Sequence, residues 1–561
     1  MASTILVIGV AGYFSFLLHT GWMNNGGSGV ELPYNLIAWC FASVLSVVFW
    51  LFLPSSGKPV ITPLFLLLLA GALLMSLPLI WSPSFLAFHN ALPRTGGLWA
   101  GMFFLLMLRQ AILTEKHTQI LLYSLVFAGA AEAVIVLCEL YTPGTWLPAI
   151  WQKLIMKYGR YGAGVFQQVN VTASFLATSL AICLMLFASG TFSSDSNRME
   201  RFRLTVIAIA ILLLSSVLTL LCSRIGWLSG FSSAGAVWLI LTFSRHKKQS
   251  RHQGLLLLLM VTGIVLGYQL MHTSIGQALA EHSGSNHQRI LTLYHTLIFS
   301  SKHPFIGYGA GTYEGYYQSY MAGLLSGNQS RELMSHPHNE LLYQYSEGGV
   351  IALAGVLIWY AVYLWLWFRA KTSIQITALL AILPLLLHTQ VEYPLYYSVP
   401  HWLTLLLLIR LAEGETGTHS VIDFKYQAGC FIKSAYLLLS VYGAFVSQQA
   451  ISNGKIMSQF ENSELTSTHP ITSMKVSWIQ QFRYEQDLNL TRLIDFQKSH
   501  NVDSLQTFAD MNARIISVHP APELYSNQIA VLNYLHEYRK ASEWLQRAHY
   551  TLPWETQFSV N

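Results

Sequence analysis

Two apolar runs separated by a two-residue turn decide the fold class of this chain. Residues 204–222 read LTVIAIAILLLSSVLTLLC and residues 225–243 read IGWLSGFSSAGAVWLILTF, with only Ser223 and Arg224 between them. Each run is close to the roughly 20 apolar residues that a helix needs to cross the hydrocarbon core of a bilayer. Backbone polar groups in lipid must be paired within the segment, which favours a helix over an irregular chain. The pair therefore predicts a hairpin of two membrane-spanning helices.

Similar runs occur along most of the sequence and predict an all-α polytopic membrane protein with about 13 spans, within a range of 12–14. The first run lacks a basic segment and a small-residue cleavage site, so we interpret it as a retained helix. The predicted spans are residues 4–22, 35–53, 62–80, 94–114, 118–141, 169–190, 204–222, 225–243, 254–272, 345–367, 372–388, 398–411 and 434–450.

The composition of the chain excludes several classes of protein. Of 561 residues, 53% are hydrophobic and 10% are charged, against about 25% charged in typical soluble domains. A soluble enzyme is therefore excluded, and the 13% aromatic content excludes a disordered chain. The formal charge of +6 is spread in small groups between apolar runs, so nucleic acid is not an expected partner. The five cysteines show neither a disulfide framework nor a zinc-binding spacing.

The distribution of Lys and Arg predicts how the chain crosses the membrane. With the N-terminus in the cytoplasm, most basic residues before the C-terminal tail fall in cytoplasmic turns, as the positive-inside rule expects. We divide the chain into spans one to nine (1–272), a large outer loop (273–344), spans ten to thirteen (345–450) and a small helical domain on the outer face (451–561). The loop is rich in Tyr and His, and loops of this length usually carry function.

The C-terminal segment contains a candidate helical hairpin. Residues 523–553 predict two amphipathic helices, in which Ala541, Ala548 and Pro553 are spaced as in the second helix of a tetratricopeptide unit. A single partial repeat leaves two interpretations open, a repeat-like domain or a helical cap on the outer loop.

Three arginines on the outer side oppose the charge bias and are candidates for function, because charge at the membrane edge is costly. Arg160 lies in Gly159-Arg-Tyr-Gly-Ala-Gly164, Arg224 lies in the two-residue turn, and Arg289 opens the stretch Arg289-Ile-Leu-Thr-Leu-Tyr-His295. Each alone is consistent with a lipid-headgroup anchor. Together their guanidinium groups match the oxygens of a lipid diphosphate.

Two polar clusters lie on the outer side. Ser335-His-Pro-His-Asn-Glu340 leads into span ten, and its histidines are candidates for a general base, a structural pair or a metal site. Metal is disfavoured because no second ligand cluster accompanies them. The second cluster, His388 to Tyr397, is also consistent with an aromatic belt at the membrane interface. Glu132, in the middle of span five, is interpreted as a buried hydrogen-bonding partner.

These motifs resemble those of the O-antigen ligase and polymerase superfamily. Ser335 to Glu340, followed by Glu347-Gly-Gly-Val350, is similar to the family's His-Asn turn and the Glu-x-Gly after it. The segment from Arg289 to His303-Pro-Phe-Ile-Gly-Tyr-Gly-Ala-Gly311 is similar to its Arg and Pro-x-x-Gly-x-Gly signature, and Ser223-Arg224 resembles its Ser-Arg turn.

Within the superfamily, the chain resembles the PglL-type bacterial protein O-oligosaccharyltransferases. The element from Arg160 to Gln168-Val-Asn170 is similar to their Arg and Gln-Pro-Asn element, with Val169 in place of proline. Glu392-Tyr-Pro-Leu395 is similar to their Glu-Tyr-Pro-Leu segment. The subfamily assignment therefore depends on two short elements that lie far apart in the sequence.

The resemblance implies transfer of a preassembled glycan from undecaprenyl diphosphate to Ser or Thr of periplasmic proteins such as pilin, at the bacterial inner membrane. It implies no metal and no cofactor, and a single displacement that inverts the anomeric carbon. Arg160, Arg224 and Arg289 would bind the donor diphosphate, and His338 would act as catalytic base. The residues expected to support or position these groups are Gln168, Asn170, His336, Asn339, Glu392 and Tyr393.

Other functions remain open at this point. An O-antigen ligase shares the donor but acts on lipid A core, and a Wzy-type polymerase extends the glycan itself. A lipid-linked glycan transporter would place charges deep within spans and show repeated halves, neither of which the sequence favours. A purely structural or pilus-docking protein would leave the outer arginines unexplained. Membrane lipids are expected contacts in every case, and the sequence does not specify the oligomeric state.

Overall fold

The computed structural model describes residues 1–20, 24–53, 59–142, 144–158, 161–243, 250–271, 286–415, 426–463 and 467–559. These residues form helices and connecting turns, with no β-strand among them, which confirms the predicted all-α fold class. The chain is a multi-pass membrane protein.

The helices follow one another with short connections. Their bounds are α1 Ala2–Ser15, α2 Pro33–Phe52, α3 Pro63–Ser76, α4 Phe85–Gln110, α5 Glu115–Tyr141, α6 Ala149–Tyr158, α7 Val169–Ser189, α8 Asn197–Leu220, α9 Arg224–Phe243, α10 Ser250–Met271, α12 Asn286–Ser301, α13 Tyr313–Ala322, α14 Glu340–Arg369, α15 Ser373–Thr389, α16 Pro394–Tyr397, α17 Val399–Glu413, α18 Tyr426–Glu461, α19 His469–Thr472, α20 Gln481–Ser499, α21 Val502–Ile516, α22 Pro522–Tyr534 and α23 Tyr538–Thr551.

All thirteen predicted spans fall on helices, but fewer are long enough to cross a membrane. Ten of the described helices meet the requirement by length and composition. Two others, Pro63–Leu79 and α15, are shorter apolar helices, and α17 has 15 residues. The apolar run at 62–80 breaks where α3 passes into a 3-10 turn containing Pro78, and α17 begins only after the short helix α16. Hydropathy shows the apolar run but does not show these interruptions.

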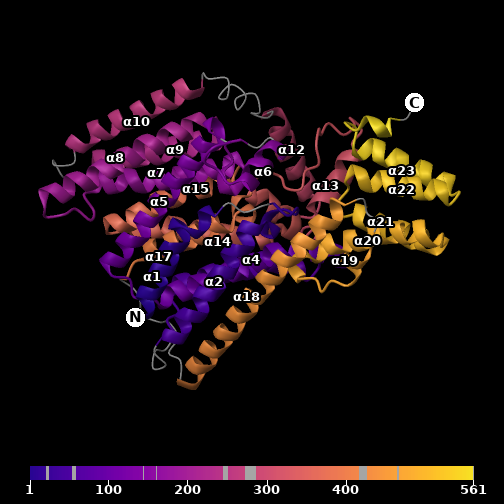
Figure 1. Cartoon of the computed structure of the whole chain (residues 1–561), viewed down its shortest axis with the longest axis horizontal. Helices are drawn as coiled ribbons and strands as arrows, with labels where there is room; N and C mark the ends of the chain where they lie inside the picture. Colours follow the sequence, from indigo (N-terminus) through magenta and orange to yellow (C-terminus); the bar gives the residue numbers. More distant parts are fainter. Residues whose placement is uncertain are drawn as a thin grey trace.

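Helix α7 is the centre of the bundle (Figure 1). It packs against α5, α8, α9 and α15, and its residues from Val171 to Ala188 are buried. Apolar residues on every face suit a helix that is surrounded by other helices. Gln168 lies immediately before its first residue, so the end of the most enclosed helix carries one of the predicted functional elements.

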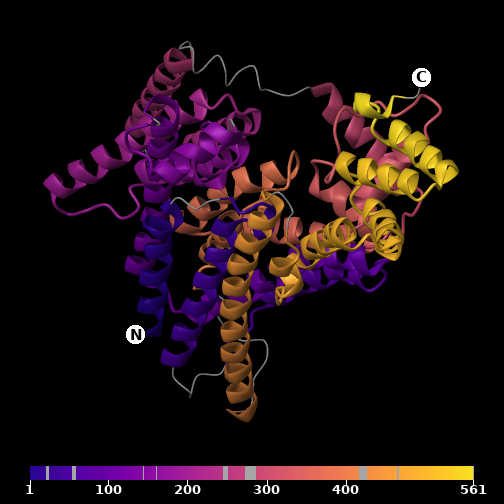
Figure 2. The same ribbon diagram turned by 45° about the vertical axis from the view of Figure 1, so that its right-hand side comes forward.

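The C-terminal helices α19 to α23 lie at one end of the bundle, next to α13 (Figures 1 and 2). Helix α18 runs for 36 residues and enters this region without a break. The predicted hairpin at 523–553 is present as α22 and α23, with Ala541 and Ala548 buried between helices. Its attachment is polar: Gln318 Nε2 donates to the Thr551 carbonyl at 2.8 Å, and His519 Nδ1 lies 2.8 Å from Glu314 Oε1.

Candidate active site

Glu392 is the meeting point of three predicted site residues. Its Oε1 accepts hydrogen bonds from Asn170 Nδ2 at 2.6 Å and from an Arg289 guanidinium nitrogen at 3.2 Å, and its Oε2 accepts from Gln168 Nε2 at 3.0 Å. His388 Nε2 lies 3.2 Å from the same Oε2. Because a carboxylate only accepts hydrogen bonds, this nitrogen carries the proton. A buried carboxylate therefore holds side chains from four separate segments in one arrangement.

The start of α7 explains why Gln168 and Asn170 face the same carboxylate. Gln168 has extended backbone angles as the N-cap residue, and Val169 is the first helical residue. Val169 stands where proline is common, because the first residue of a helix has no use for its N–H. The replacement of the family's proline by Val169 therefore leaves the local geometry intact.

Two buried acidic side chains hold the segment that precedes Gln168. Glu132 Oε2 accepts from the Val165 N–H at 3.2 Å, and Glu139 Oε2 accepts from the Gly164 N–H at 3.0 Å. His19 Nδ1 lies 2.7 Å from the other oxygen of Glu132. The interpretation of Glu132 as a buried hydrogen-bonding partner is confirmed, and its partner is the backbone of the predicted Arg160–Asn170 element.

The Ser-Arg turn is connected to the same carboxylate through Asn170. Ser223 Oγ donates to Asn170 Oδ1 at 2.8 Å and accepts from the Gly226 N–H at 3.1 Å, so it caps α9. Cys222 has a φ of 53°, in the left-handed region, which sets the sharp change of direction. Arg224 is the first residue of α9 and its side chain is exposed. The predicted hairpin between spans is confirmed, with its polar turn directed towards Glu392.

His338 and His336 form a rigid turn before α14. His338 has a φ of 57°, and its N–H donates to His336 Nδ1 at 2.9 Å. The ring of His336 lies between Tyr343 and Tyr393, with centroid distances of 4.3 and 4.6 Å. His338 Nδ1 and His336 Nε2 are buried and have no hydrogen-bond partner within the described ranges. The unpartnered atom of His338 leaves this imidazole available to a substrate.

The charges around Glu392 also act on His338. Burial lowers the pKa of His338 below its usual value of 6.5, the negative charge of Glu392 raises it, and Arg289 lowers it. Burial opposes ionisation of Glu392, but hydrogen bonds from His388 and Asn170 and the charge of Arg289 outweigh it and lower its pKa. His338 is therefore neutral at neutral pH, the form that accepts a proton.

The two flanking residues differ in what they contact. Burial lowers the pKa of His336 well below 6.5, and the charges of His338 and Arg94 lower it further. Burial and the charge of Glu392 raise the pKa of Tyr393 to about 12, so its hydroxyl stays protonated. The aromatic cluster at 388–397 is not a membrane-interface belt, since Tyr393 packs on His336 inside the protein.

Comparison with protein families gives two matches. A family described as "O-Antigen ligase" matches residues 208–357, and one described as "Virulence factor membrane-bound polymerase, C-terminal" matches residues 376–561. Together these ranges cover more than half of the chain and include Arg289, His338 and Glu392. The chain belongs to the O-antigen ligase and polymerase superfamily. No curated protein matches it. The superfamily predicted from the motifs is confirmed, and the protein is a membrane enzyme that handles lipid-linked glycans.

Two superfamily motifs pack directly on each other. The Val350 N–H donates to the Pro304 carbonyl at 2.8 Å, and the Gly309 N–H donates to the Glu347 carbonyl at 2.9 Å. Helix α14 is broken at Gly349, whose φ is 57° and ψ is −153°. A Cβ atom at Gly349 would lie 2.3 Å from the carbonyl carbon of Phe305, so only glycine fits. The Glu-Gly-Gly motif is therefore the dock for the Pro-x-x-Gly-x-Gly loop.

Arg94 is a residue of this region that the sequence reasoning missed. It forms a largely buried ion pair with Glu347, and its guanidinium carbon lies 4.6 Å above the ring centre of Tyr343. Glu347 Oε1 also accepts from the backbone N–H of Gly311 at 3.1 Å. A signal was present in the sequence, because Arg94 is another outer basic residue inside an apolar run. It lacks the glycine-rich surroundings that singled out the other arginines.

Other predicted site residues lie at the edge of this arrangement or outside it. Asn339 caps α14 through Leu342 N–H at 3.0 Å and donates to Gln390 at 3.2 Å, so its observed contacts fix the helix start. Arg160 lies outside the described residues, and its role stays a prediction. Within the described ranges no group of three or more His, Cys, Asp or Glu side chains is placed to hold a metal. The expectation of a reaction without metal or cofactor also stays a prediction.

Proposed function

We propose that this protein is an O-linked protein glycosyltransferase of the bacterial inner membrane. It transfers a preassembled oligosaccharide en bloc from undecaprenyl diphosphate to Ser or Thr hydroxyls of periplasmic proteins such as pilin. The N-terminus is cytoplasmic, and the loop at 273–344 and the C-terminal domain are periplasmic.

One observation carries the proposal beyond the superfamily. The two elements that resemble PglL-type enzymes, residues 160–170 and 392–395, are more than 200 residues apart, and they meet through hydrogen bonds from Gln168 and Asn170 to Glu392. Arg289, from the superfamily's Arg signature, bonds to the same carboxylate. Elements singled out separately in the sequence thus belong to one polar centre, as expected for residues that act on one substrate.

The chemistry assigned to this centre is a single displacement. His338 accepts the proton of the acceptor hydroxyl as its oxygen attacks the anomeric carbon. The new bond joins that oxygen to the anomeric carbon, and the bond to the diphosphate oxygen breaks. The electron pair of the broken bond remains on the leaving undecaprenyl diphosphate. Attack opposite the leaving group inverts the anomeric configuration.

The arginines would stabilise the charge that develops on the diphosphate. Arg289 has five N–H donors and its side chain is 38% exposed, so its bond to Glu392 leaves donors free for phosphate oxygens. Glu392 fixes the orientation of the guanidinium before substrate binds, which is how preorganised charge contributes to catalysis. Arg224, exposed at the start of α9, and Arg160 are assigned to the same diphosphate.

The C-terminal domain is the proposed contact for the protein acceptor. It lies at the end of the bundle that carries the site (Figure 1), and it is attached to the 286–339 segment through Gln318 and Glu314. This position puts a folded surface close to the histidine turn, where a hydroxyl of a bound protein can approach His338. An acceptor that is a sugar or a lipid has no comparable need for such a surface.

The test of this function is the identity of the acceptor. Cells that make a lipid-linked glycan and a pilin are compared with and without this protein, and intact masses of the pilin and of the lipopolysaccharide are measured. A glycan-sized increase on the pilin alone is the expected result. An increase on the lipopolysaccharide alone would reject protein glycosylation and establish the second candidate, an O-antigen ligase, which the description of the family at residues 208–357 favours.

A further inference from the structure

Helix α12 has its apolar residues on the outside. Ile290, Tyr294 and Leu297 follow a helical spacing of four and three residues and are 66%, 60% and 52% exposed. On the opposite face Thr292 and Thr296 are fully buried. This is the reverse of the pattern that the hydrophobic effect produces in water.

The buried polar face of α12 is satisfied within the protein. Thr296 Oγ1 lies 2.8 Å from the hydroxyl oxygen of Tyr313 on α13, and Ser300 Oγ donates to the Thr296 carbonyl at 2.7 Å. Phe299, near the end of the helix, is the large apolar side chain that packs inward, where it stacks on Tyr308 at 4.2 Å. The orientation of α12 is therefore set by specific contacts and leaves the face of Ile290, Tyr294 and Leu297 without a protein partner in the described chain.

The C-terminal domain shows the ordinary pattern at the same end of the molecule. In α21, Leu505, Phe508 and Ile515 are buried. In α23, Arg539 faces outward with its side chain 93% exposed. The two regions thus differ in their surroundings: the C-terminal helices are built for water, whereas the outer face of α12 is built for an apolar medium.

The exposed face of α12 belongs to a longer apolar surface that reaches the membrane-spanning part of α14. Val350, Leu357 and Leu364 recur every seven residues along α14 and are exposed, as lipid-facing residues are. The loop that follows α12 docks on α14 at Val350, and it exposes Phe305 and Ile306 beside this stripe. The lipid-facing surface of α14 therefore continues onto the chain that leads from α12.

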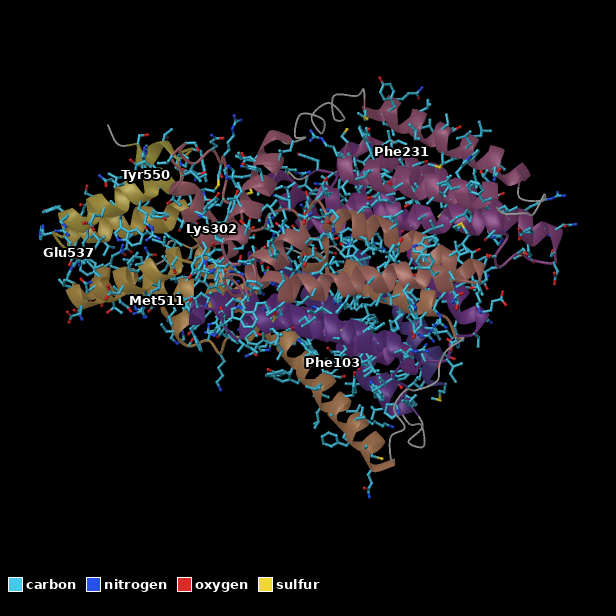
Figure 3. All side chains as sticks on the ribbon, turned by 180° about the vertical axis from the view of Figure 1, so that it is seen from behind. Phe103, Phe231, Lys302, Met511, Glu537 and Tyr550 are labelled. Atoms are coloured by element: carbon cyan, nitrogen blue, oxygen red, sulfur yellow. The ribbon has the colours of Figure 1, made fainter. Side chains whose placement is uncertain are left out.

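We propose that α12 lies in the surface of the bilayer, at the end of the bundle that carries Glu392, with Ile290, Tyr294 and Leu297 among the lipid chains. The helix has 16 residues and is not among the helices able to span the membrane, so it lies in the interface plane. Lys302, just past its C-terminal end, provides a basic group for the headgroup region, and Figure 3 shows it at the junction between the bundle with Phe231 and the C-terminal helices with Tyr550.

This placement fixes the depth of the site. Arg289 precedes Ile290 on α12 and bonds to Glu392, so its guanidinium lies at the level of the lipid headgroups. A lipid-linked phosphate in the same leaflet then reaches Arg289 without leaving the membrane. The inference on α12 itself does not depend on which acceptor receives a glycan.

A matched pair of tyrosines tests the proposal on the unmodified protein. Tyr294 on α12 and Tyr538 on α23 are 60% and 62% exposed, so water-borne reagents would attack both equally if both faced water. Hydroxyl-radical footprinting in nanodiscs, read by mass spectrometry, should modify Tyr538 several-fold faster than Tyr294. Equal rates would overturn the proposal.

A second experiment separates lipid from a protein cover such as another copy of the chain. The five native cysteines are replaced by alanine, and a single cysteine at Tyr294 is labelled with bimane before reconstitution with lipids that carry a doxyl quencher on the acyl chain. Quenching should match that of a label at Leu357 on α14 and exceed several-fold that at Tyr538. Protection of Tyr294 from radicals without quenching by these lipids would show a protein cover instead and would reject the lipid contact.

Discussion

Glu347 and Glu392 are both buried carboxylates that meet an arginine from a distant segment, yet they are satisfied by different kinds of group. Glu347 accepts from the backbone N–H groups of Gly311 at 3.1 Å and Tyr313 at 3.3 Å, and it pairs with Arg94. The side chain of Arg94 is 17% exposed. These partners belong to the docked glycine-rich loop and to α4, so Glu347 joins pieces of the fold.

Glu392 is held by side chains. Gln168, Asn170 and Arg289 donate to it, and Arg289 is 38% exposed, so its guanidinium also reaches solvent. The comparison teaches that a conspicuous acid in a motif is not by itself a site. An acid that fixes backbone has an architectural role, whereas an acid that orients a half-exposed cation is placed to organise a binding site, and we assign Glu392 to the second kind.

The largest expected effect is on stability, at Glu347. Glu347→Gln leaves Arg94 as an uncompensated buried charge, which costs about 3–5 kcal/mol of unfolding free energy. Thermal unfolding in detergent should show a much lower midpoint than in the wild type. A wild-type midpoint combined with loss of glycan transfer would reverse the roles that we assign to the two acids.

The next effect is on activity, at Glu392. Glu392→Gln keeps the shape of the side chain but removes the charge that orients Arg289, and a misplaced catalytic group costs about 100-fold in rate. The rate of glycan transfer per folded molecule should fall by that factor while the unfolding midpoint changes little. A variant that transfers at the wild-type rate would exclude Glu392 as an organiser of the site.

The pH dependence of transfer sharpens the comparison further. Since burial holds the pKa of His338 below 6.5, the rate should be maintained to a pH below 6.5 and fall as His338 gains a proton. Glu392 raises this pKa and Arg289 lowers it. The acid limb of the pH–rate profile should therefore move to lower pH in Glu392→Gln and to higher pH in Arg289→Met. Identical midpoints in the three proteins would show that these charges do not act on the titrating group.

The smallest effect is expected at the position where the chain departs from its subfamily's pattern. Val169 is the first residue of α7 and Gln168 has φ −148° and ψ 125°, the extended conformation required before a proline. Val169→Pro should raise the unfolding free energy by about 0.4–1 kcal/mol and leave transfer unchanged. Ala173→Pro, one turn later in the same helix, is the matched control and should cost about 3 kcal/mol. Destabilisation by both prolines would show that α7 does not begin at Val169.

Much of this architecture was predictable because it depends on local pattern. The apolar runs predicted all thirteen helices of the bundle, and the hairpin at Ser223 and Arg224 followed from two runs with no room for a longer loop. The element before Asn170 and the segment at Glu392 were singled out independently. Their direct hydrogen bonds were not predicted, since nothing in the sequence specifies which distant polar groups become partners.

Three features were beyond the sequence for physical reasons. The pairing of Arg94 with Glu347 depends on how α4 packs against α14, and the break at Gly349 depends on a loop that docks there. The outward apolar face of α12 required knowledge of which face packs against the protein. Periodicity shows that a helix has two faces, but only packing shows which one is turned inward.

The central claim is that His338, held beside the Glu392 centre, removes the proton of the acceptor. Its most direct measurement is the rate of glycan transfer to purified pilin by the enzyme in nanodiscs, for the wild type, His338→Ala and the control His469→Ala, whose histidine is exposed on α19. Loss of a general base lowers the rate by about 100-fold or more, so we expect that loss in His338→Ala alone, with all three proteins folded. Transfer by folded His338→Ala near the wild-type rate would contradict the account.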